Sequence, residues 1–141
     1  MESVAVRSQA PRRNRWMTLA GWIVSLAPLV IVGMSARWKL TYDPWYVREF
    51  GRIGWSTSAL PWLAGIQLTA VALFLIPPTA VLGTVLLTGY LGGAIASYVR
   101  IGELYPPLVP LGTALLAWLG VYLREPRLWY LLPLVRTPRN E

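Results

Sequence analysis

The sequence predicts an all-α integral membrane protein, a four-helix bundle with an interfacial segment between its first and second helices. Of its 141 residues, 55% are hydrophobic and only 13% are charged, whereas soluble domains carry about a quarter charged residues. So small a body cannot bury that much apolar surface, and we expect lipid to cover part of it. Eight tryptophans and seven tyrosines agree with this prediction, because amphipathic rings favour the headgroup level of a bilayer.

The first expected element is a basic N-terminal tail, residues 1–15, which we expect to be disordered. A transmembrane domain over residues 16–133 follows. Its first span, 16–36, has 21 residues without a charge, enough to cross about 30 Å as a helix. A cleaved signal peptide would have a shorter apolar region and would not need the apolar segments that follow, so we interpret 16–36 as a retained span. A polar tail, residues 134–141, closes the chain.

The next element, residues 37–55, mixes charged and aromatic residues and is too polar to span a membrane. We expect an interfacial segment with a short helix after Asp43-Pro44, with Asp as the N-cap and Pro at the first helical position. The lipid-facing side of this helix would comprise Trp45, Tyr46, Phe50 and Ile53. Whether residues 40–55 re-enter the membrane is left open by the sequence.

Three further spans are expected at about 58–76, 79–99 and 107–123. Pro77-Pro78 forces a break between the first two, because neither proline can donate a backbone hydrogen bond, and so predicts a tight antiparallel hairpin. Four spans place both termini on one side, with eight arginines there against five basic residues on the other. The excess favours both termini in the cytoplasm.

The chain has no cysteine and no histidine. This excludes disulfides, thiolate nucleophiles, Ser-His-Asp triads and the usual haem, zinc and copper ligation. No paired-carboxylate site is recognisable either, so the sequence leans against an enzyme without deciding the question. The basic residues lie in short segments between apolar runs, which favours topology and anionic lipid over nucleic acid as their explanation. We predict no metal site.

Four charged residues lie on the same membrane face in this topology: Lys39, Asp43, Arg100 and Glu103. One hypothesis is that they line a polar mouth that binds a ligand on the non-cytoplasmic side. The alternative is that each anchors its own segment at the headgroups.

Gln67 is the polar exception inside the spans and lies near the middle of the second. Its unpaired amide would be costly in hydrocarbon, so it must face the bundle interior. The expected partners are Tyr90, Thr88 and the carbonyl freed by Pro28. Gln67 is then either a hydrogen bond between helices or a contact for a ligand such as a quinone carbonyl, with Tyr90 in the same cavity.

The third span carries rows of small residues that predict close helix packing on two faces. The residues expected to make these contacts are Gly89, Gly92, Gly93 and Ser97. The string "GYLGGA" does not match the dinucleotide fingerprint GxGxxG.

"LLTGYLGGA…VRIGE", within residues 76–103, resembles the DoxX-like family of small four-span bacterial membrane proteins. "SARWKL", residues 35–40, is similar to that family's Ser-Gly-x-x-Lys-Leu stretch, with Lys39 on the lysine. The likeness extends over roughly residues 18–133 and ends in "LGVYLREPRLWYLLP". The family usually has a glutamate where this chain has Gln67, and a glycine where it has Ala36. An amide can hydrogen-bond at that position but cannot titrate.

This resemblance implies a multi-pass protein of the bacterial cytoplasmic (inner) membrane. The family is named for a subunit associated with quinol oxidation and thiosulfate:quinone oxidoreduction, although most DoxX-like members have no established function. We therefore expect an accessory or scaffold subunit, linked to a quinone-dependent redox complex. The alternative is a bundle that binds a small molecule, quinone or lipid in a cavity near Gln67 and Tyr90. No cofactor is predicted, since no motif specifies a quinone. The expected partners are the lipid bilayer and other membrane or redox subunits.

Overall fold

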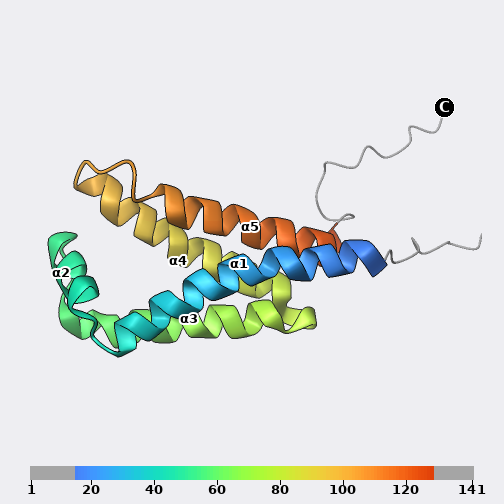
Figure 1. Cartoon of the computed structure of the whole chain (residues 1–141), viewed down its shortest axis with the longest axis horizontal. Coiled ribbons are helices and arrows are strands. Elements are labelled where there is room, and N and C mark those ends of the chain that lie inside the picture. The colour runs from blue at the N-terminus through green and yellow to red at the C-terminus, as the bar shows by residue number, and fades with distance from the viewer. Residues whose placement is uncertain (1–14, 129–141) are drawn as a thin grey trace, which may run out of the picture.

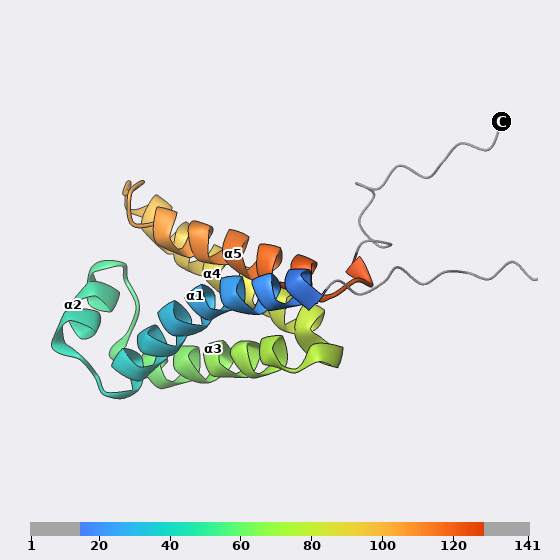
Figure 2. The same ribbon diagram turned by 45° about the vertical axis from the view of Figure 1, so that its right-hand side comes forward.

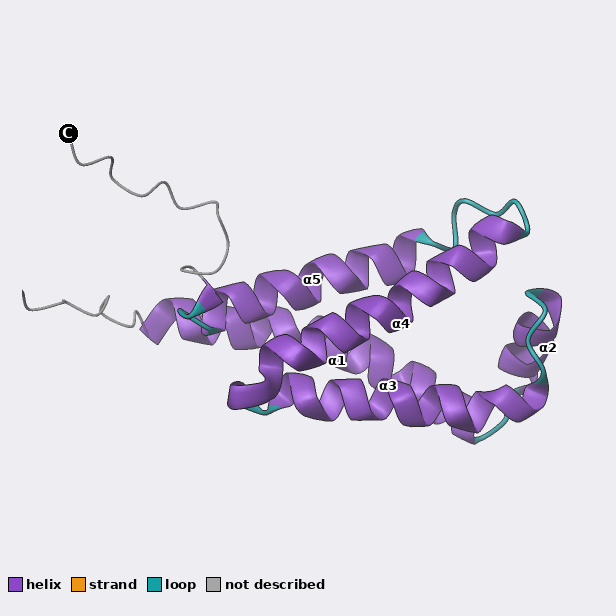
Figure 3. Ribbon diagram, turned by 180° about the vertical axis from the view of Figure 1, so that it is seen from behind, coloured by secondary structure: helices purple, strands orange, loops and turns teal. Residues whose placement is uncertain are grey.

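A computed structural model of the protein describes residues 15–128, and every regular element in that part of the chain is a helix (Figure 3). The helices are α1 (Arg15–Leu40), α2 (Pro44–Arg52), α3 (Leu60–Leu75), α4 (Ala80–Arg100) and α5 (Leu108–Arg124). Short 3-10 turns, Thr57–Ala59 and Pro77–Thr79, lead into α3 and α4. Apart from Arg15, the tails expected at 1–15 and 134–141 lie outside the described residues.

The four longer helices pack side by side in the spatial order α1, α3, α4, α5, and α5 returns to contact α1 (Figures 1 and 2). Neighbouring helices run in opposite directions. The start of α1, the α3–α4 turn and the end of α5 therefore lie at one end of the molecule, which we call the Arg124 end. The short helix α2 and the α4–α5 connection lie at the other end, the α2 end (Figure 1).

Most of the surface of these helices is apolar. The helix α1, and α3 and α4 with their leading turns, are long and apolar enough to cross a membrane, whereas α5 is a shorter apolar helix of 17 residues. Only 22% of the most apolar stretch of α1 is buried, and side chains such as Ile23 and Trp62 are 67% and 78% exposed. The apolar composition therefore serves mainly the outer surface, which suits contact with lipid.

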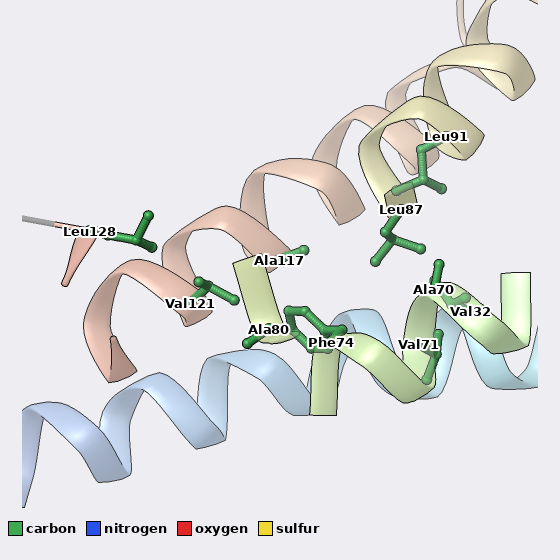
Figure 4. Close-up of a cluster of buried hydrophobic side chains, with 10 residues drawn as sticks. All are labelled: Val32, Ala70, Val71, Phe74, Ala80, Leu87, Leu91, Ala117, Val121 and Leu128. Carbon is green, nitrogen blue, oxygen red and sulfur yellow. The ribbon is translucent and has the colours of Figure 1, made fainter. Parts of the chain in front are cut away.

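An apolar cluster lies where the longer helices meet (Figure 4). Phe74 of α3 and Leu87 of α4 are each 1% exposed, and Val121 of α5 is fully buried. Lipid chains are as apolar as leucine, so a membrane core of this kind stabilises the fold through close van der Waals contact. Figure 4 shows Phe74 beside Ala80, across the tight α3–α4 turn that the two prolines predict.

Glycine allows close backbone approach at two places in the described chain. A Cβ atom on Gly21 of α1 would lie 2.8 Å from the backbone nitrogen of Arg124 and 2.9 Å from the carbonyl oxygen of Gly120 on α5. A Cβ on Gly83 would overlap the backbone of Leu73 and Phe74. These contacts close the α1–α5 and α3–α4 pairs, as small residues do between membrane helices.

The glycines predicted to pack are different ones, and none of them makes a close contact within the described chain. A Cβ on Gly89, Gly92 or Gly93 would meet no atom within 4 Å. Ser97 bonds the carbonyl of Gly93 in its own helix and accepts a hydrogen bond from the Trp55 indole. The reason is geometric: α4 turns the face that carries Leu87 and Leu91 toward the core, which leaves the glycine rows on the outer side.

The short helix expected after Asp43-Pro44 is present as α2, and its Asp43 carboxylate accepts hydrogen bonds from the backbone nitrogens of Trp45 and Tyr46. The prediction that Trp45, Tyr46, Phe50 and Ile53 form the lipid-facing side of this helix is only partly right. Trp45 is 57% exposed, but Ile53 is buried, and the rings of Tyr46 and Phe50 lie over a buried cation of α1. These rings turn inward because they cover a charge.

Candidate functional site

A buried lysine on α1 forms the centre of the polar interior. The helix continues past the expected end of the first span to Leu40, so Lys39 belongs to its last turn and is only 3% exposed. Helical side chains point back toward the N-terminus of their helix, and this direction draws the ammonium inward from the end of the helix. Its Nζ donates to Ser35 Oγ at 2.5 Å and to Gln67 Oε1 at 2.8 Å.

Gln67 of α3 is 1% exposed, which confirms that it faces the interior, but its partners differ from those predicted. Its Oε1 accepts from Lys39, and its Nε2 donates to the Val32 carbonyl at 2.6 Å. Neither Tyr90 nor the carbonyl freed by Pro28 bonds it in the described chain. Thr88 instead accepts from the indole of Trp118 at 2.9 Å. Lys39 reaches Gln67 because α1 and α3 pack directly together.

Three aromatic rings surround the ammonium of Lys39. Its Nζ lies 5.4 Å from the ring centroid of Tyr46, 5.6 Å from that of Phe50 and 5.6 Å from that of Tyr90. A lysine ammonium has three N–H donors; two are bonded, and the rings face the remaining charge. Each cation–π contact contributes up to about 2 kcal/mol when desolvated. Among the described residues no carboxylate forms an ion pair with Lys39.

Tyr90 separates this cluster from an open groove between α3 and α4. The groove has a volume of about 1000 Å³ and is lined by Pro61, Trp62, Gly65, Ile66, Thr69, Val85, Leu86, Gly89 and Tyr90. Gly65 and Gly89 deepen it, since each leaves open space where a Cβ would stand. The lining is mostly apolar. The described chain offers the Tyr90 hydroxyl no hydrogen-bond partner, while the ring of Tyr90 faces Lys39.

The structure does not join the four charged residues predicted to share a polar mouth. Lys39 bonds Ser35 and Gln67, while Asp43 caps α2. Arg100 donates to the Ile53 carbonyl at 2.6 Å, and Glu103 pairs with Arg52. No hydrogen bond or ion pair in the described chain links any two of the four. All lie at the α2 end, but each is taken up by a nearer partner.

The bond from Arg100 to the Ile53 carbonyl and the bond from Arg52 to Glu103 help to attach α2 to the end of α4. Arg52 bonds Glu49 in its own helix, with Nε 2.9 Å from Oε2, and bonds Glu103 after α4. The hydrogen bond from Arg52 lowers the pKa of Glu49, and the bonds to Glu49 and Glu103 raise the pKa of Arg52. Burial against the cluster raises the pKa of Tyr46. Arg48 and Arg52 are exposed, whereas the side chain of Glu49 is only 15% exposed. The rings of Tyr46 and Phe50 cover Lys39.

Sequence reasoning missed a second buried cation. Arg124, counted only as a topological charge, is 4% exposed. A signal for its burial was present in the sequence of α5. Thr113, Ala117, Gly120 and Val121 recur at helical spacing on one side of α5, and Arg124 continues that buried row.

The open groove ends at the Tyr90 phenol, which has no hydrogen-bond partner in the described chain, and the ammonium of Lys39 lies 5.6 Å from the centroid of that ring. The described residues hold no cluster of three or more acidic, cysteine or histidine side chains that could bind a metal ion.

A sequence model of the DoxX-like family matches residues 23–120, which include α2, α3 and α4 entire, together with Lys39, Gln67 and Tyr90. No curated protein and no solved structure matches the chain. The family match and the long apolar helices together indicate a small multi-pass membrane protein. The chain belongs to the DoxX-like family.

Proposed function

We propose that this protein binds a small amphipathic molecule with a carbonyl or hydroxyl oxygen, of the quinone class, in the groove between α3 and α4. The supporting observation is Tyr90, whose ring stands between the open groove and the ammonium of Lys39. The oxygen of the ligand would accept a hydrogen bond from the Tyr90 hydroxyl, and its apolar part would lie along Trp62, Ile66 and Leu86. Binding sites of this type combine an apolar wall with a few polar groups that orient the ligand.

The proposal includes a membrane orientation. The four longer helices span the bacterial cytoplasmic membrane as a bundle, with α2 at the non-cytoplasmic surface and both termini in the cytoplasm. The outward apolar side chains and the distribution of basic residues support this orientation. The chain lacks cysteine, so single cysteines at Ser56 and Arg127 report the two ends. We expect an impermeant maleimide to label Ser56→Cys in intact cells, and Arg127→Cys only after permeabilisation. The reverse pattern would invert the orientation.

The groove is tested by filling it. Gly65→Leu places a side chain in the groove, whereas Gly112→Leu on α5 adds the same side chain where a Cβ also meets open space. Native mass spectrometry of protein reconstituted with a short-chain ubiquinone analogue should show retention by the wild type and by Gly112→Leu, and loss in Gly65→Leu. Tyr90→Phe removes one hydrogen bond of about 1 kcal/mol, so retention should fall roughly fivefold. Equal retention by all four proteins would indicate simple partition into detergent and would refute the proposal.

A second candidate function is an accessory subunit of a membrane complex linked to quinone-dependent redox chemistry. The outward glycine rows of α4 favour it, because a helix of a partner could approach Gly92 and Gly93 closely. Neither residue lines the groove. Gly93→Leu should therefore abolish co-purification of a partner while leaving retention of the quinone analogue unchanged. Co-purification unaffected by Gly93→Leu would exclude this face as the interface.

A further inference from the structure

A second cavity, of about 470 Å³, lies at the Arg124 end of the molecule. It is lined by Trp22 of α1, by Pro77 and Pro78 at the α3–α4 turn, and by residues 124–127 at the end of α5. It shares no lining residue with the groove at Tyr90. Its chemistry can therefore be considered separately.

Arg124 is the unusual member of this lining. Its Nη2 donates to the carbonyl of Phe74 near the end of α3, a contact that ties α5 to the α3–α4 turn. Its Nε and Nη1 are buried and have no hydrogen-bond partner in the described chain. The guanidinium carbon lies 4.3 Å from the ring centroid of Phe74 and 4.5 Å from that of Trp22.

These contacts leave the charge of Arg124 only partly compensated. Cation–π contact and one carbonyl offset some of the cost of burial, and a cation at a helix C-terminus is favoured by the helix dipole. Nevertheless, removing an ion from water costs several kcal/mol and leaving its donors unpaired adds to that cost. No carboxylate among the described residues forms an ion pair with this guanidinium. An anion from outside the chain would supply what is missing.

We propose that this cavity binds the phosphate group of an anionic phospholipid, with Arg124 as its principal ligand. The planar donors of arginine match phosphate oxygens. The lining carries Arg124 and Arg127 against Glu125 alone, and the prolines stand at the positive, N-terminal end of α4. In the proposed orientation the cavity lies at the end of the apolar helices, where headgroups are found. The ring of Trp22 covers one face of the guanidinium, so the phosphate must displace the edge of that ring.

The test is lipid retention, measured by native mass spectrometry of protein released from nanodiscs with equal phosphatidylglycerol and phosphatidylcholine. The wild type should retain phosphatidylglycerol preferentially, and Arg124→Gln should abolish the preference. Arg124→Gln also loses the bond to the Phe74 carbonyl and could fail to fold. Two variants that keep Arg124 therefore test the cavity without this risk. Arg127→Gln should lower the preference and Glu125→Gln should raise it, each by about threefold, as expected for single charges near water. Arg48→Gln, at the α2 end, should leave it unchanged.

Inorganic phosphate distinguishes the two sources of a phosphate group. We expect an excess of free phosphate to leave retention of phosphatidylglycerol intact. Full competition would assign the cavity to a soluble phosphate and overturn the lipid assignment. Equal retention of both lipids, unaffected by the variants at 125 and 127, would overturn the site itself. None of these results bears on quinone retention in the groove, because these variants do not touch it.

Discussion

The bond between Lys39 and Gln67 can be measured with a double-mutant cycle of Lys39→Met, Gln67→Leu and the combined variant. The Nζ–Oε1 distance is 2.8 Å and both groups are buried. Hydrogen bonds to charged groups contribute about 1.5–3 kcal/mol, whereas those between membrane helices average about 0.6 and reach about 1.7 kcal/mol. The overlap of the two ranges gives an expected coupling of about 1.5 kcal/mol, roughly tenfold in the unfolding equilibrium constant.

The assay is equilibrium unfolding in mixed micelles by titration with sodium dodecyl sulfate, followed by circular dichroism. Gln67→Leu alone should be the most destabilised protein, because among the described residues it leaves Ser35 as the one side-chain acceptor for the ammonium of Lys39. Adding Lys39→Met should restore part of the loss, since it removes the buried charge. The control cycle pairs Lys39→Met with Thr69→Val. The hydroxyl of Thr69 donates to the Gly65 carbonyl of its own helix, and in the described chain it bonds no other helix. A coupling for Lys39 and Gln67 no larger than that of the control, within about 0.5 kcal/mol, would refute the reasoning.

Two further predictions concern packing and pH. Gly83→Ala should destabilise the protein by more than about 2 kcal/mol, because the added Cβ would overlap backbone atoms. Gly93→Ala places its Cβ in open space and should stabilise the isolated chain by about 0.5 kcal/mol. Equal unfolding midpoints for the two variants would contradict the packing at the α3–α4 turn. The lowered pKa of Glu49 means that the stability it contributes is present above its ordinary pKa of 4.5 and is lost as pH falls through the lowered value. Midpoints measured between pH 6 and 3 should therefore fall more for the wild type than for Arg52→Gln, and parallel profiles would show that this pair does not stabilise α2.

The helical class, the α3–α4 hairpin and the cap of α2 follow from the sequence because each depends on local chemistry. A long uncharged run, a Pro-Pro break and an Asp-Pro start specify their structures without help from distant residues. Gln67 is predictable in the same way, since an amide within an apolar helix has to turn inward. What could not be predicted is its partner. That choice depends on how far α1 continues and on the register in which it meets α3.

The site was predicted less well than the fold. Lys39 follows the uncharged run, which suggests a position among the headgroups, yet its long side chain returns along α1 into the protein. The glycines of α4 were assigned to packing because small residues commonly serve that purpose. Such a pattern does not say whether the facing helix belongs to the same chain. The closest approaches instead use Gly21 and Gly83, which stand outside any conspicuous glycine row.

The position of α1 between α3 and α5 sets an order on biogenesis. The helix made first finds its last neighbour only when the ribosome has completed α5, because Gly21 and Ser25 pack against Gly120. Until then this face of α1 stands in lipid without its matching surface, although the Lys39–Gln67 contact can form as soon as α3 inserts. A nascent chain that ends after α4 would therefore hold Lys39 in its buried position and still lack α5, the second neighbour of α1.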